Sequence, residues 1–256
     1  MKTALLSIML TFTLFQGCQP DPGPVEEGPV NGTFRAFHHI QATYRPGHEA
    51  RALYEELLPA PLTMPEEPEI LFTVLHFTRM STALFRPYRE AVIFLTGHYG
   101  GRDYRHIITQ PVTSQLANQG GIAMGLPKYM ADGIDLIRNP DGRVSGEVRD
   151  RGAVRLSMAF QPTSPMQKGL DSGYLDNVRF QFSPPWYRYP DVRPSEDFHT
   201  VYSVYVTDRI DSQPGMVRIR LHPQDPWAGL LPPEGITVPG LYSEWEGRRD
   251  MKTGTP

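Results

Sequence analysis

Alternation of apolar and polar residues along the middle of the chain predicts β-strands. In residues 88–96, alternate positions place Tyr88, Glu90, Val92 and Phe94 on one face of a strand. Turn residues at 140–142 and 150–152 separate three of the strands and predict an antiparallel meander. The other predicted strands span residues 36–44, 69–77, 105–109, 134–138, 142–149, 153–160, 178–182, 199–206 and 216–222.

One stretch has the period of a helix. Ala50, Leu53, Tyr54 and Leu57 lie at i, i+3, i+4 and i+7, and Pro59 ends the pattern. The 26 prolines among 256 residues are about twice the usual share, which favours many turns over a helical bundle. The pattern therefore predicts an α+β fold, mostly antiparallel, built as a curved sheet or a cone-like β-barrel.

The N-terminal residues 1–17 have the layout of a secretion signal. Lys2 supplies a positive charge, and the mostly apolar residues 4–15 are too few to cross a bilayer as a helix. Gly17 precedes Cys18, the only cysteine, and this pairing is similar to the bacterial lipoprotein signal. We expect an exported protein, in the periplasm or on the outer face of a bacterial membrane, anchored by acyl chains on Cys18. The alternative is an ordinary cleaved signal that leaves a free thiol.

The rest of the chain reads as a tether, one domain and a tail. Residues 18–33 are rich in proline and glycine, residues 34–245 are enough for one sizeable core, and the polar residues 246–256 are expected to fray. The net charge of −3 and the even spread of Lys and Arg argue against nucleic-acid binding. The spacing of His and Cys predicts no metal site. The glycines form no phosphate-binding motif, so we expect no nucleotide cofactor.

The short element Gly125-Leu126-Pro127-Lys128 presents a lysine from a stiff turn. Proline fixes its own φ, and Gly125 permits backbone angles closed to other residues. The flanking residues 122–124 and Tyr129 are apolar or aromatic, and desolvation disfavours the charged form of an amine. A neutral amine can attack a carbonyl and form an imine. The alternative is a surface lysine that follows a loop proline.

Glu90 is the carboxylate most worth attention, because it shares a strand face with apolar neighbours. A buried carboxylate must be paired or hydrogen-bonded, so Glu90 is either a site residue or part of a salt bridge at a sheet edge. Thr73 falls on one face of its strand with Leu71 and Leu75. We interpret Thr73 as a core residue or as one lining a cavity.

With these residues in view, the chain resembles the acetoacetate decarboxylase superfamily over residues 34–245. The most specific part is the G-x-P-K element that ends in Lys128, and the other motifs follow in the family's order. They are Tyr44-Arg45, Leu58-Pro59-Ala60-Pro61-Leu62, Phe72-Thr73-Val74, Pro87-Tyr88-Arg89-Glu90, residues 142–162 and Leu231-Pro232-Pro233. The resemblance implies a β-rich cone with an internal pocket and a homo-oligomeric assembly.

The resemblance also implies site roles. Lys128 would form an imine with a small β-keto acid or another carbonyl compound, and Glu90 would position the amine or relay a proton. Arg35 is nearest in sequence to the family's carboxylate-binding arginine. Tyr88, Met124 and Tyr129 are the further substrate-binding candidates beside these residues.

Three departures from the family pattern affect the functional reading. Tyr129 stands where the decarboxylase has a second lysine, Thr73 replaces an acidic residue, and Gly121-Ile122 replaces an Arg-Glu pair. Activation of Lys128 would then depend mainly on burial. The leading hypothesis is a Schiff-base lyase, a decarboxylase or an aldolase. The alternatives are a non-catalytic exported lipoprotein that binds a small carbonyl compound or acid, and an interaction module with Lys128 on an exposed loop.

Overall fold

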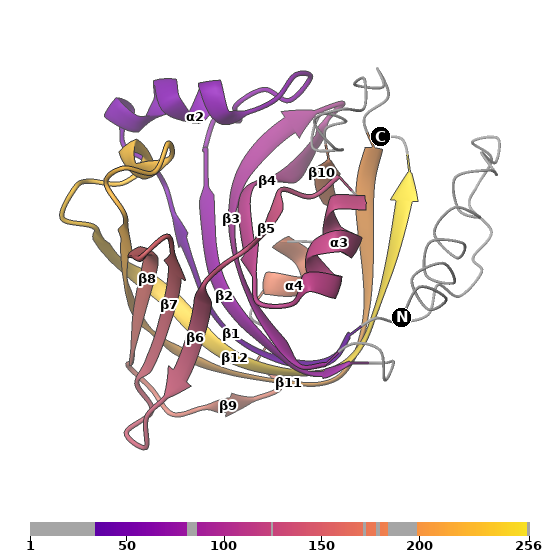
Figure 1. Ribbon diagram of the computed structural model, residues 1–256, viewed down its shortest axis with the longest axis vertical. Helices are drawn as coiled ribbons and strands as arrows, with labels where there is room; N and C mark the ends of the chain where they lie inside the picture. Colours follow the sequence, from indigo (N-terminus) through magenta and orange to yellow (C-terminus); the bar gives the residue numbers. More distant parts are fainter. Residues whose placement is uncertain are drawn as a thin grey trace.

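One curled sheet of twelve strands makes up most of the fold (Figure 1). The computed structural model describes residues 34–80, 86–123, 125–170, 173–177, 180–183 and 199–254. The strands are β1 Phe34–Tyr44, β2 Ile70–Met80, β3 Tyr88–Tyr99, β4 Arg102–Val112, β5 Lys128–Met130, β6 Gly133–Arg138, β7 Val144–Asp150, β8 Ala153–Pro162, β9 Gln167–Lys168, β10 Phe180–Ser183, β11 His199–Leu221 and β12 Ile236–Gly254. The helices are η1 His48–Ala50, α2 Arg51–Leu57, α3 Gln115–Ala123, α4 Tyr174–Asn177 and η3 Ala228–Leu230.

Strand order closes one part of this sheet into a barrel. The order is β10-β4-β3-β2-β1-β12-β11-β8-β7-β6, and β10 also pairs with β11. The first half of β11 therefore belongs to the barrel, while its second half pairs with β8 and begins a second layer. Figure 1 shows α3 and α4 inside the curve of the barrel and β6, β7 and β8 packed against its outer face.

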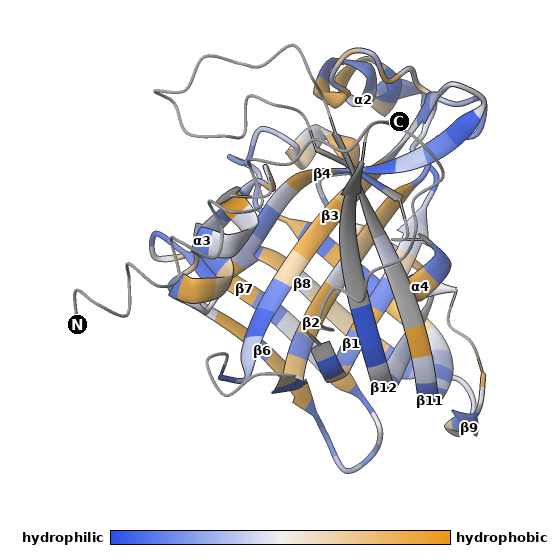
Figure 2. Cartoon of the chain, turned by 90° about the vertical axis from the view of Figure 1, so that its right-hand side faces the viewer, coloured by the Kyte–Doolittle hydropathy of each residue, from blue (hydrophilic) through white to orange (hydrophobic). Residues whose placement is uncertain are grey.

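Two hydrophobic cores lie on opposite faces of β1, β2 and β3. The outer core joins the barrel wall to β6–β8 and α2, with Phe72, Ile93 and Phe160 among its buried residues. The inner core fills the barrel beneath α3 and α4 and includes Tyr88 and Trp245. Figure 2 shows hydrophobic residues recurring along the strands of both layers, as expected for strands that alternate between two buried faces.

The expected α+β fold with a curved, mostly antiparallel sheet is confirmed, and so is the helix before Pro59. Two expectations were wrong. The predicted strands 199–206 and 216–222 are one strand, β11, because a stretch with the composition of a turn, ending in Pro214-Gly215, stays paired to β12. The predicted polar tail is also strand up to Gly254, because residues 246–254 pair with the first half of β11.

Helix α3 was not predicted, because Gly120 and Gly121 weaken the helical signal. The predicted signal at residues 1–17, the lipidation site Cys18, the tether to residue 33 and Met124 lie outside the described residues. Within the described part of the chain, no helix is both long enough and apolar enough to cross a membrane.

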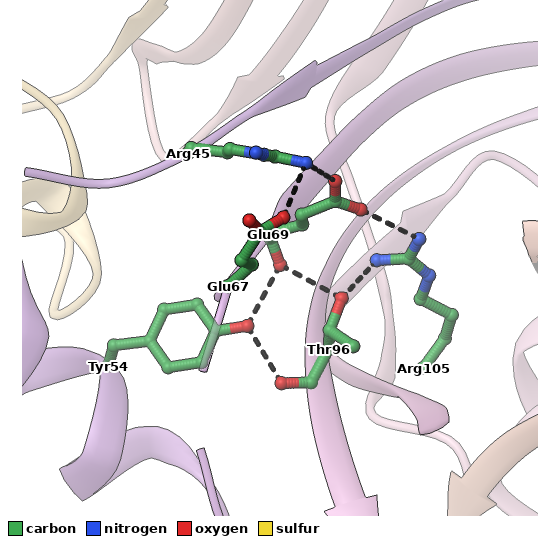
Figure 3. Close-up of polar contacts among 6 residues, drawn as sticks. All are labelled: Arg45, Tyr54, Glu67, Glu69, Thr96 and Arg105. Atoms are coloured by element: carbon green, nitrogen blue, oxygen red, sulfur yellow. Dashed lines mark hydrogen bonds and ion pairs between the residues drawn. The ribbon is translucent and has the colours of Figure 1, made fainter. Parts of the chain in front are cut away.

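Helix α2 is fastened to the barrel by a buried tyrosine. The hydroxyl of Tyr54 lies 2.9 Å from the carbonyl oxygen of Glu69 and 2.8 Å from that of Thr96, and the residue is fully buried. Burial raises the pKa of this hydroxyl, so it remains a donor. Around it, Figure 3 shows Arg105 bonded to Thr96 and Glu69, and Arg45 bonded to Glu69 and Glu67.

We expect Tyr54→Phe to lower the free energy of unfolding by about 1–2 kcal/mol, because it removes the donor shared by one buried and one partly buried carbonyl. Urea denaturation measures the change. The matched control is Tyr44→Phe, the same substitution at a half-buried tyrosine at the end of β1. Equal destabilisation by both variants would contradict the anchoring role of Tyr54.

Candidate functional site

The end of α3 and a parallel strand pair place Lys128. The amides of Gly125 and Leu126 donate to the carbonyls of Ile122 and Gly121, both at 2.9 Å, which is the Schellman pattern of a helix end. Gly125 has φ +77, the left-handed geometry that this pattern requires. The chain then turns into β5, where Lys128 pairs with Gln110 of β4. The stiff presentation of Lys128 therefore comes from a helix cap followed by a strand.

The amine of Lys128 is paired with the carboxylate of Glu90 inside the barrel. Lys128 Nζ lies 3.1 Å from Glu90 Oε2, and the two side chains are only 6% and 7% exposed. Glu90 comes from β3, on the face predicted from strand alternation. Two charges this deep must satisfy each other, because an unpaired buried charge is costly.

Tyr88 bonds to the same carboxylate oxygen as Lys128. Its hydroxyl donates to Glu90 Oε2 at 3.4 Å, and its ring stacks on Phe77 with centroids 4.8 Å apart. Burial first, and the charge of Glu90 second, raise the pKa of Tyr88 well above its usual range, while Arg249 acts in the opposite direction. The phenol therefore stays protonated and remains a hydrogen-bond donor to Glu90.

Gly121 leaves the room that the lysine side chain occupies. A Cβ at this position would lie 2.2 Å from Lys128 Cδ and 2.7 Å from its Cε. The neighbouring Gly120 has no atom within 4 Å of the same position. One glycine of the pair is thus required by the close approach of Lys128, and the sequence alone does not tell which.

Uncharged polar side chains lie on the same face of the sheet as Glu90. Thr73, His39 and Gln110 are all buried, and Thr73 Oγ1 and Gln110 Oε1 have no hydrogen-bond partner among the described residues, while His39 has the side chain of Gln41 as a neighbouring partner. Gln110 stands directly beside Lys128 in the β4–β5 pair. His39 and Gln110 were missed from the sequence, since nothing local links them to Lys128.

Two of the predicted substrate-binding residues lie away from the ion pair. Arg35 is exposed beside an irregularity in β1, and the nearest β1 side chain that enters the inner core is Phe37, stacked on Trp245 at 5.0 Å. Tyr129 points to the opposite side of β5 from Lys128, because neighbouring residues of a strand alternate. It lines a separate cavity of about 10 Å³ with Arg155 and Trp227. Burial raises its pKa.

The arrangement supplies an amine and a phenol that both contact one carboxylate, surrounded by aromatic and polar groups, with the guanidinium of Arg249 close enough to act on Tyr88. This set can attack a carbonyl and move protons without another group. Among the described residues, no three His, Cys, Asp or Glu side chains are grouped so that they could hold a metal ion.

Comparison with solved structures gives a consistent fold. A structure of acetoacetate decarboxylase is 14% identical, covers 89% of this chain and 91% of its own, and has a TM-score of 0.66. An acetoacetate decarboxylase-like enzyme from Sphingomonas wittichii RW1 is 19% identical, with 89% and 94% covered and a TM-score of 0.64. The enduracididine biosynthesis enzyme MppR, complexed with pyruvate, is 15% identical, with 93% and 94% covered and a TM-score of 0.65.

No curated protein sequence matches this chain. The family described as Acetoacetate decarboxylase (ADC), however, matches residues 34–244, which include β1, the ion pair and most of the second layer. That match spans most of the chain and agrees with the similar solved structures. By its sequence and its fold, the chain belongs to the acetoacetate decarboxylase family.

Proposed function

We propose that this protein is a Schiff-base-forming lyase that acts on a small carbonyl compound through Lys128. The observation that supports the proposal most strongly is the buried contact of 3.1 Å between Lys128 Nζ and Glu90 Oε2. The family match and the pyruvate bound by MppR are compatible with a small carbonyl substrate. Membership of a family alone does not fix the reaction, so the proposal depends on the site.

Imine formation begins with transfer of a proton from Lys128 to Glu90. The neutral Nζ adds to the carbonyl carbon, and a proton passes from nitrogen to the former carbonyl oxygen. Glu90 then returns its proton to that oxygen, which leaves as water. The product is a protonated imine beside an ionised Glu90, so the ion pair of the resting site is re-formed. Tyr88 keeps Glu90 in place throughout by donating its hydroxyl.

Bond cleavage uses the protonated imine as an electron acceptor. In a β-keto acid, the bond between the α carbon and the carboxylate breaks, its electron pair moves toward the imine nitrogen, and CO₂ leaves. Protonation of the resulting enamine at carbon, followed by addition of water, releases the ketone and restores Lys128. In a β-hydroxy ketone, the same acceptor serves retro-aldol cleavage, with the hydroxyl proton passing to a base such as Glu90.

A second candidate function is non-catalytic binding of a carbonyl compound or acid by an exported lipoprotein. Thr73 and Phe37 favour it, because they add no charge to the inner face beside the ion pair. We also propose that Cys18 is lipidated and that the protein forms homo-oligomers. Both features are compatible with the binding function and with an enzyme. Light scattering of the purified domain would measure the assembly, and a monomer would contradict it.

The imine is tested by borohydride reduction with acetoacetate, pyruvate and acetylpyruvate, followed by mass spectrometry of tryptic peptides. We expect an adduct on the Lys128 peptide, none in Lys128→Ala, and formation slowed about 100-fold in Glu90→Gln, because proton transfer is lost. Lys168→Ala, at an exposed lysine of β9, is the control and keeps the adduct. Absence of any adduct on wild type would reject the lyase and leave the binding function.

The space at Gly121 gives a second test that changes no reacting group. Gly121→Ala is expected to push the Lys128 side chain away from Glu90 and reduce the adduct yield at least about 10-fold, since small displacements in a site have large effects on rate. Gly120→Ala makes the same change one residue earlier in α3, where the space is open, and is expected to react like wild type. Similar loss in both variants would point to damage of the helix instead.

Lipidation of Cys18 is tested in a bacterial host. We expect radiolabelled palmitate to enter the full-length chain, and Cys18→Ser to abolish the label and release the protein from the membrane fraction. Labelling that persists in the serine variant would contradict this expectation.

A further inference from the structure

We propose that the site contains a second, uncharged subsite, formed by Thr73 and His39, which takes a hydroxyl or carbonyl oxygen of the ligand held at Lys128. The inference rests on the proposed function only in placing that ligand at the amine. The subsite would restrict the ligands of this protein to carbonyl compounds that carry a second, uncharged oxygen.

The main observation is a buried hydroxyl without a partner near a buried imidazole. Thr73 and His39 are 0% exposed, and Thr73 Oγ1 makes no hydrogen bond to the described residues. The side chain of Gln41 acts on His39 as a hydrogen-bond partner, which leaves the second ring nitrogen for a ligand. The ring of His39 lies against that of Tyr174 of α4, with centroids 4.5 Å apart and the two planes tilted by 38°. A buried polar group left unsatisfied destabilises the protein, so these groups favour a ligand that pairs with them.

The register of the sheet places Thr73 one strand away from Glu90 of the ion pair and His39 two strands away, all on the same face. Leu75 of β2 stands between Glu90 of β3 and His39 of β1 in one cross-strand row, and Thr73 lies two residues along β2 on the same face. Thr73 is thus the diagonal neighbour of both Glu90 and His39, at a typical distance of about 7–8 Å for such pairs. A ligand joined to Lys128 reaches Thr73 with a short chain.

The chemistry of the subsite selects for an uncharged group. Burial is the main cause that lowers the pKa of His39 to about 3, against a smaller opposite effect of a side-chain hydrogen bond with Gln41, so its imidazole is neutral at neutral pH. A neutral imidazole offers one donor and one acceptor, and a threonine hydroxyl offers both. A hydroxyl or carbonyl oxygen matches these groups, whereas a carboxylate would meet no positive charge from either of them.

The test compares 4-hydroxy-2-butanone with 2-pentanone, which differ by a hydroxyl in place of a methyl group. Isothermal titration calorimetry measures affinity, and borohydride trapping measures the imine. Wild type is expected to bind the hydroxy ketone at least about 10-fold more tightly, because 2-pentanone leaves the polar groups unpaired. Thr73→Val is expected to bring the ratio of the two affinities close to one. The variant is also expected to raise the melting temperature of the empty protein. His39→Phe is a second variant and is also expected to lower the ratio of the two affinities.

The matched control is Thr109→Val, the same change at a buried threonine of β4 whose side chain lines the cavity around Tyr129. It is expected to keep the wild-type preference. A ratio near one in wild type, or a ratio unchanged in both Thr73→Val and His39→Phe, would overturn the subsite. A hydroxyl-dependent affinity without a trapped adduct would support the subsite and reject the imine, so the two failures are distinguishable.

Discussion

The buried pair of Lys128 and Glu90 sets the conditions that the surrounding structure must meet. Neither charge is tolerable alone at this depth, since removing one partner of a buried ion pair typically costs about 3–5 kcal/mol. The pair forms only if the end of α3, the β4–β5 pairing and the position of Glu90 on β3 agree closely. Gly121 is required for the same reason, because any larger residue would displace the lysine side chain.

Closure of the barrel explains how such a pair is kept out of water. The long strands β11 and β12 serve both the barrel and the second layer, so one sheet has two buried faces. The outer face carries an apolar core, and the inner face carries apolar side chains with a few polar groups among them. Stability can be supplied by the outer core, which leaves the inner face free to hold groups that destabilise the empty protein.

The structure shows where the residues that differ from the family pattern lie. Tyr129 lies away from Lys128, so a residue at that position contributes to the packing between layers and does not sit at the amine. Phe37 and Thr73 make the inner face less charged than a site with an additional arginine and carboxylate. A ligand recognised by hydrogen bonds to neutral groups suits this face better than one recognised by its charge.

Strand alternation in the sequence was enough to place Tyr88, Glu90 and Val92 on one face, and the G-x-P-K element was enough to single out Lys128. Local patterns decide such features, because they depend on residues a few positions apart. The sequence could not bring Glu90 to Lys128 across 38 residues, turn Tyr129 away, place Gln110 beside Lys128, or place His39 on the same face two strands from Glu90. Those relations depend on the register between strands and on closure of β10 against β11, and only the packed tertiary structure fixes them.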